Sequence, residues 1–289
     1  MTRRSARSLL LIAAAALLAA ACTRLAYMNA SLAYENAAPM LAWMIDDYVD
    51  LTPAQGDWVQ ARLDDAMAWH RSRELPGYAR FLASVGERSG RPFTEAEVGA
   101  AWADVHADYA RVVEHVLPDV AEFLAGLDER QVARLERRFA DDNRRIAEEW
   151  THGTPEERRA KSVKRMIAHL EEWVGPLDDR QREIVAAREA ALPPSTEAYL
   201  ADRRYRQVET LALVRSHDRD RIAAGLHRLL LEPSAWRRPE YQASLRAREE
   251  LMFRMIARLS ATLTAEQREQ LQARIRGYMR EITRLAASG

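Results

Sequence analysis

A five-residue unit that begins with Leu and ends with Gln recurs four times along this chain of 289 residues. The copies start at Leu51, Leu127, Leu177 and Leu263 and end at Gln55, Gln131, Gln181 and Gln267. Their second residues are Thr52, Asp128, Asp178 and Thr264. A Thr or Asp oxygen at this position accepts a hydrogen bond from the amide three residues on, and the Gln side chain returns to the cap amide. Each unit is therefore predicted to be a capping box that starts a helix.

The residues between these boxes have the spacing of amphipathic helices. After Leu51, for example, apolar side chains fall at Val59, Leu63 and Met67. No segment shows the sustained two-residue alternation of a half-buried strand, and only 11 Gly and 11 Pro interrupt the chain. We predict an all-α fold, an array of about ten capped helices. The expected helices span 39–50, 53–72, 76–86, 95–125, 129–150, 155–174, 179–191, 195–215, 218–231, 238–261 and 265–286.

The apolar pattern around the second box repeats around the fourth. Residues from Val120 to Phe139 match those from Ile256 to Ile275 at the same offsets. A small polar break at residues 151–155 lies between the two patterns. We therefore expect two duplicated helical halves, residues 39–150 and 155–289.

The first 21 residues have the order of a bacterial export signal. Arg3, Arg4 and Arg7 precede an uncharged run from Leu9 to Ala21, which Cys22 follows. This run of 13 residues is too short for the roughly 20 that span a bilayer. A Cys at the cleavage point resembles a lipobox, which implies that Cys22 is diacylated, with palmitate for example, and anchors the protein to a membrane.

Residues 22–38 are expected to form a lipidated, membrane-proximal segment. This segment carries five large apolar or aromatic side chains, at Leu25, Tyr27, Met28, Leu32 and Tyr34. Such a segment packs either on the helical body or at the lipid headgroup layer. Both arrangements would hold the helical body close to the membrane.

Charge and cysteine content exclude several classes of function. The chain has 43 basic and 43 acidic residues, so removal of the three signal arginines leaves 40 against 43, a net charge of −3. A nearly neutral protein has no general attraction for nucleic acid. Cys22 is the only cysteine, so a lipidated chain has no thiol for a disulfide or a nucleophile. We found no Gly-rich phosphate loop, Gly-x-Ser-x-Gly elbow or His-Glu-x-x-His pair.

Two groups of residues have a partial resemblance to metal sites. Asp46, Asp47 and Asp50 with Glu74 make an acidic group, but they lack the Gly-spaced loop of a calcium site. Glu149 and His152 have the spacing of a di-iron ligand pair, without the second pair that such sites need. We expect no metal, no cofactor and no enzyme activity.

The aromatic and basic residues near Trp69 allow two interpretations. Trp69, His70 and Arg71, with Tyr78 beyond Leu75-Pro76, form either the wall of a binding groove or a helix-turn-helix corner. We favour the corner, with Trp69 in the core. Trp43, Trp69, His70, Arg71 and Tyr78 remain the candidate binding surface.

Two resemblances follow from these motifs. Leu51–Gln55 and Leu263–Gln267 match the LTxxQ motif of periplasmic stress chaperones of the spheroplast-protein-Y type, which implies a helical cradle for unfolded clients. The segments Trp43–Pro53, Trp69–Tyr78, Asp142-Asn143 and Gly153–Arg158 resemble an uncharacterised family of proteobacterial helical lipoproteins. That second resemblance covers most of the mature chain and implies no particular activity.

Together these features predict a non-enzymatic lipoprotein of the cell envelope that faces the periplasm. Thr23 replaces the Asp that retains lipoproteins at the inner membrane, so we expect the outer membrane. The body is expected to bind proteins, either many unfolded clients, as a chaperone does, or one specific partner, as a structural scaffold does. A hydrolase with scattered catalytic groups is the third alternative.

Overall fold

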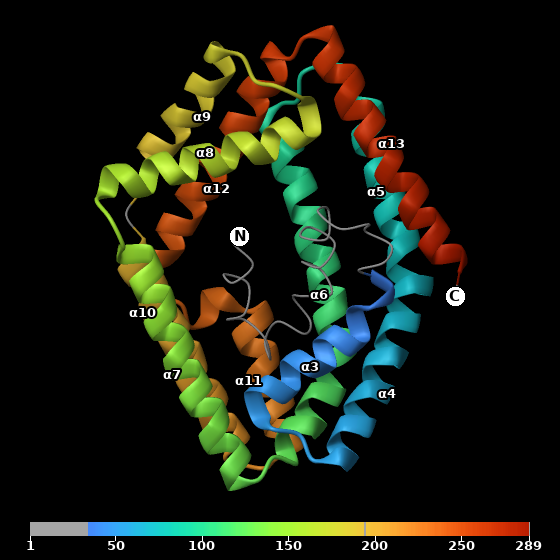
Figure 1. Cartoon of the computed structure of the whole chain (residues 1–289), viewed down its shortest axis with the longest axis vertical. Coiled ribbons are helices and arrows are strands. Elements are labelled where there is room, and N and C mark those ends of the chain that lie inside the picture. Colours follow the sequence, from blue (N-terminus) through green and yellow to red (C-terminus); the bar gives the residue numbers. More distant parts are fainter. Residues whose placement is uncertain (1–33, 194, 289) are drawn as a thin grey trace. The chain divides into compact units, whose positions relative to one another are not determined.

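The computed structural model describes residues 34–193 and 195–288 (Figure 1). Every regular element in these residues is a helix, which confirms the all-α fold. The α-helices are α3 (Ala37–Val49), α4 (Pro53–Trp69), α5 (Leu75–Arg88), α6 (Glu95–Ala125), α7 (Glu129–Thr151), α8 (Pro155–Val174), α9 (Asp179–Ala191), α10 (Thr196–Val214), α11 (Arg219–Leu231), α12 (Pro239–Thr262) and α13 (Ala265–Ala287). A π-helical segment (His70–Glu74) follows α4, and a short 3-10 helix (Pro233–Ala235) follows α11.

The recurring five-residue units start four of these helices. Thr52, Asp178 and Thr264 each accept from the amide of the Gln three residues on, and that Gln side chain accepts from the cap amide. Asp128 and Gln131 make the same two bonds at the start of α7, at 2.7 and 3.2 Å. Local capping therefore decides where the helices begin, and most observed bounds lie within two residues of the expected ones.

The chain forms two compact units, each built from three separate segments. Unit 1 contains residues 34–71, 106–149 and 196–238 of the described chain. Unit 2 contains residues 72–105, 150–195 and 239–288, apart from residue 194. The chain passes between the units after residues 71, 105, 149, 195 and 238. These units differ from the sequential halves that we expected.

Each unit consists of three helical hairpins that alternate along the chain with those of the other. Unit 1 holds the α3–α4 hairpin, the end of α6 with α7, and the α10–α11 hairpin. Unit 2 holds α5 with the start of α6, the α8–α9 hairpin and the α12–α13 hairpin. The first sequential half thus gives its middle hairpin to unit 2, and the second half gives its middle hairpin to unit 1. Helix spacing does not reveal this exchange, because it carries no information about which hairpin packs on which.

The glutamines of the capping boxes join two hairpins within each unit. In unit 1, Gln55 and Gln131 exchange two amide hydrogen bonds, at 3.1 and 2.7 Å. In unit 2, Gln181 and Gln267 do the same at 2.7 and 2.9 Å. Gln131, Gln181 and Gln267 are almost fully buried, so these bonds satisfy polar groups that water does not reach. Each of these glutamine side chains therefore caps its own helix and also hydrogen-bonds to the glutamine at the start of the helix with which it pairs.

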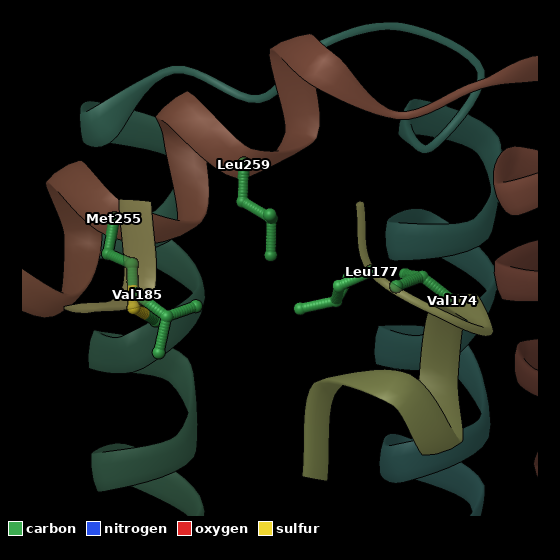
Figure 2. Close-up of a cluster of buried hydrophobic side chains, with 5 residues drawn as sticks. All are labelled: Val174, Leu177, Val185, Met255 and Leu259. Carbon is green, nitrogen blue, oxygen red and sulfur yellow. The ribbon is translucent and has the colours of Figure 1, made fainter. Parts of the chain in front are cut away.

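Each unit has its own apolar core. In unit 2, Val174 and Leu177 from the α8–α9 corner pack with Val185, Met255 and Leu259 (Figure 2). Helices α5 and α13 lie side by side in the same unit. Ile275 of α13 packs against Gly86 of α5, where an added Cβ would lie 3.3 Å from Ile275 Cγ2.

The core of unit 1 is formed by side chains that are completely buried. They come from all three of its hairpins and include Val49, Val112, Leu135 and Ile222. The α10–α11 hairpin, which comes from the second half of the sequence, is therefore part of a core that the first half begins.

Candidate binding site

An apolar groove lies between α3, α4 and α6 in unit 1. Its hollow has a volume of about 60 Å³. The lining residues are Ile45 from α3, Trp58, Val59, Arg62, Leu63 and Ala66 from α4, and Val116, Asp119, Val120 and Phe123 from α6. Val59, Leu63 and Ala66 are four and three residues apart, so they share one face of α4. Helical periodicity thus builds the floor of the groove.

Two contacts between α4 and α6 form the walls of the groove. The rings of Trp58 and Phe123 stack with their centroids 6.2 Å apart and an angle of 15° between the planes. Arg62 lies over the Trp58 ring at 5.3 Å, and its Nε is 3.8 Å from Asp119 Oδ1. Residue numbers rise along α4 while they fall along α6, so the two helices are antiparallel. The Arg62 and Asp119 side chains are more than 40% exposed, so this pair adds little to stability but marks the charged rim of the groove.

His70 marks one end of the groove. It is the first residue after α4, four residues beyond Ala66, and it is completely buried. Its Nδ1 is 2.9 Å from the hydroxyl of Tyr34, the first residue that the structure describes. Tyr34 is itself buried, and the Arg71 guanidinium lies 5.6 Å from its ring centre. The described chain therefore begins with a side chain that packs on His70, four residues beyond the lining residue Ala66.

The expected corner after Trp69 is not present. Residues 70–74 form a π-helical turn that leads from α4 into α5. Pro76 follows this turn, and in a regular α-helix its ring would collide with the carbonyl four residues earlier. A widened turn relieves that conflict without ending the helix. Pro76 therefore marks a change of helical pitch and not the expected break.

Three of the predicted surface residues lie together, and two do not. His70 and Arg71 contact Tyr34. Trp69 packs beside His70 and stacks on His115 with ring centres 3.7 Å apart. Trp43 is 55% exposed on α3 and does not line the groove. Tyr78 belongs to unit 2. The wall residues Trp58 and Phe123 were not predicted from the sequence, because their contact joins two hairpins and leaves no local signal.

The acidic residues near α3 have structural roles. Asp46 Oδ1 accepts from the Leu51 amide at 2.9 Å, and Asp47 pairs with Arg138. Asp50 lies 2.6 Å from Arg130. In residues 34–193 and 195–288 no group of three or more His, Cys, Asp or Glu side chains is arranged to hold a metal.

A buried polar network occupies unit 1 away from the groove lining. The Tyr48 hydroxyl donates to Asp142, which also pairs with Arg145. Arg203 Nε donates to Asn143 at 2.7 Å, and Asn143 donates to Gln207 at 2.7 Å. Tyr48 and Asp142-Asn143 belong to separate motifs of the lipoprotein resemblance. The sequence did not predict that they meet.

Burial changes the proton affinity of this network. Desolvation and the negative charge of Asp142 raise the pKa of Tyr48 above its ordinary value of 10.0. Burial also lowers the pKa of Arg203 from its ordinary value. Both shifts follow from placing ionisable groups where water does not solvate them.

We expect the raised pKa of Tyr48 to make the fold sensitive to alkali. The unfolded chain ionises Tyr48 near pH 10, whereas the folded protein keeps the phenol protonated, so stability is complete below that pH and falls above it. Urea unfolding midpoints measured from pH 8 to 11 should fall more steeply for the parent than for Tyr48→Phe. Parallel profiles for the two proteins would contradict this expectation.

A second hollow lies between α9 and α12 in unit 2. It has a volume of about 500 Å³ and is lined by Arg180, Glu183, Ile184, Ala187, Arg258, Ala261 and Thr262. Its walls mix charged and small side chains and contain no aromatic ring. The groove in unit 1 is better suited to an apolar ligand, because its walls are stacked aromatic rings.

The fold and the groove define an all-α protein with an apolar, aromatic-walled surface between three helices. Residues 47–242 match the model of a family of unknown function (DUF6279), and the chain belongs to that family. No curated protein and no solved structure matches the chain. Among the described residues, no helix has both the length and the apolar character needed to cross a membrane.

Proposed function

We propose that this chain is a non-enzymatic, lipid-anchored protein of the cell envelope whose groove holds an apolar segment of another protein. The groove carries this proposal, because Trp58 and Phe123 offer stacked rings above an aliphatic floor. Aromatic residues in such hollows commonly dominate the energy of protein binding. The histidines nearest the groove have packing roles, since His70 contacts Tyr34 and His115 stacks on Trp69.

The envelope location is proposed from the sequence. The signal peptide at residues 1–21 and the lipidated Cys22 lie outside the described residues, as does most of the segment 22–38. The uncharged run before Cys22 and the Thr that follows it support export, lipidation and an outer-membrane, periplasm-facing position. The LTxxQ-like boxes support a chaperone-like mode of binding.

The groove is tested by replacing one of its walls. The chain from residue 23 onward should suppress aggregation of unfolded client proteins, and Trp58→Ala should weaken that effect at least about tenfold, equivalent to about 1.4 kcal/mol. The matched control is Trp43→Ala, which removes an exposed Trp from the same unit outside the groove. Thermal melts establish that both variants fold. Equal suppression by both variants would contradict the proposal.

A structural scaffold with one partner is the second candidate function. A photo-crosslinking amino acid in place of Val120, which lines the groove, distinguishes the chaperone function from the scaffold function. A chaperone should crosslink to many envelope proteins, whereas a scaffold should crosslink to one dominant protein.

A further inference from the structure

We propose that residues 23–33 bind back into the groove of their own chain and occupy it until a client segment displaces them. This inference rests on the proposed function, because it treats the groove as a binding site and adds a regulator to it. The occupant is a named part of the chain that lies between Cys22 and the first described residue.

The position of Tyr34 is the first argument for this occupant. Tyr34 is 5% exposed and its hydroxyl contacts His70. His70 continues the face of α4 on which Val59, Leu63 and Ala66 form the floor of the groove. Tyr34, the first described residue, therefore packs on a side chain that lies four residues beyond Ala66 of this floor.

The segment is long enough to reach the other end of the groove. Eleven residues separate Cys22 from Tyr34, and an extended chain covers about 3.3 Å per residue, or roughly 36 Å in all. From Ala66 to Trp58, α4 advances by eight residues, about 12 Å at 1.5 Å per residue. The segment can turn back at Tyr34 and still pass Trp58.

The chemistry of the segment matches that of the groove. Residues 23–33 include Leu25, Tyr27, Met28 and Leu32 and carry a single charge, on Arg24. The hollow of about 60 Å³ suits one flexible aliphatic side chain, and Met fills irregular apolar spaces well. Asp119, whose Oδ1 lies 3.8 Å from Arg62 Nε, is 42% exposed at the rim, so its carboxylate can also accept from the one cation of the segment.

Attachment to the body makes this weak, local interaction effective. A short flexible linker gives a tethered segment an effective concentration in the millimolar range. A client must then compete with a ligand that never diffuses away. Even a modest affinity of the segment for the groove therefore raises the concentration of client that is needed to occupy the groove.

The test uses the mature chain with Cys22→Ser, which keeps the segment and omits the lipid. A fluorescent peptide of residues 23–33 is titrated into this parent and into a variant with Leu25→Ser, Tyr27→Ser and Met28→Ser. The variant should bind the peptide at least tenfold more tightly, because its own segment no longer competes. The control, Met40→Ser, changes an exposed residue of α3 outside the groove and should bind as the parent does.

A further variant ties the peptide to the groove. Adding Trp58→Ala to the triple variant should abolish peptide binding. Equal affinity in the parent and the triple variant, or binding that survives Trp58→Ala, would overturn the inference. So would a peptide that partitions onto phosphatidylethanolamine–phosphatidylglycerol vesicles but not onto the triple variant, because the segment would then belong at the headgroup layer.

The two proposals fail in different ways. If peptide titrations show no competition while Trp58→Ala still weakens client suppression, the inference is wrong and the proposed function stands. If the peptide binds as expected but Trp58→Ala does not change the suppression of client aggregation, the groove binds only the segment of its own chain. In that case the proposed function is wrong.

Discussion

We expect that neither sequential half of this protein folds when it is expressed alone, as residues 23–151 or as residues 154–289. A mixture of the two halves should fold. Unit 1 lacks its α10–α11 hairpin in the first fragment, and unit 2 lacks α5 and the start of α6 in the second. A domain has a net stability of only about 5–15 kcal/mol, and the loss of one hairpin in three removes more than that reserve.

Circular dichroism of each fragment and of the equimolar mixture measures this effect. The separate fragments should have little helical signal and no cooperative melt, and the mixture should regain both. The control is the intact chain with a protease site inserted after Gly153 and then cleaved, which should stay folded because no hairpin is removed. A cooperative melt with native helicity in either fragment alone would contradict the exchange of hairpins.

Asp142→Ala should be among the most destabilising single substitutions in unit 1, with a loss of about 3–5 kcal/mol. The Asp142 side chain is 1% exposed, and it accepts from Tyr48 and pairs with Arg145. The Arg203 side chain is 3% exposed with its Nη2 3.9 Å from Asp142 Oδ2. Removing this carboxylate leaves a buried cation and a buried hydroxyl without their negative neighbour.

The adjacent residue provides a matched control. Asp141 pairs with Arg144 on the same helix, but both side chains are more than half exposed. Asp141→Ala should therefore change the free energy of unfolding by less than about 1 kcal/mol. Urea unfolding at neutral pH measures both variants. Similar midpoints and slopes for the two would show that the network contributes no more than a surface pair.

The helices were predictable because their signals are local. A cap such as Thr52 and its Gln three residues later fix a helix start without help from the rest of the chain. The spacing of Val59, Leu63 and Ala66 likewise identified a buried face, although not what covers it. Pro76 does not define the local structure by itself, since a proline is compatible with either a break or a widened turn.

The site and the units were not predictable, because they depend on contacts between distant segments. Trp58 meets Phe123 across 65 positions of the sequence, and Tyr48 meets Asp142 across 94. A capping box shows that the side-chain oxygen of Gln131 accepts from the amide of its own cap. The two protons of the same side-chain amide have many conceivable partners. The packing of the whole unit decides which hairpin supplies the partner of each glutamine.

The glutamine pairs have a consequence for how the protein responds to its surroundings. The helix corners of both units are joined by neutral amides, which neither titrate nor attract counterions. Ion pairs elsewhere, such as Arg130 with Asp50, weaken as salt rises. Changes in acidity or salt concentration would therefore alter the ion pairs on the outer faces of the helices, while the amide pairs within each unit would stay the same.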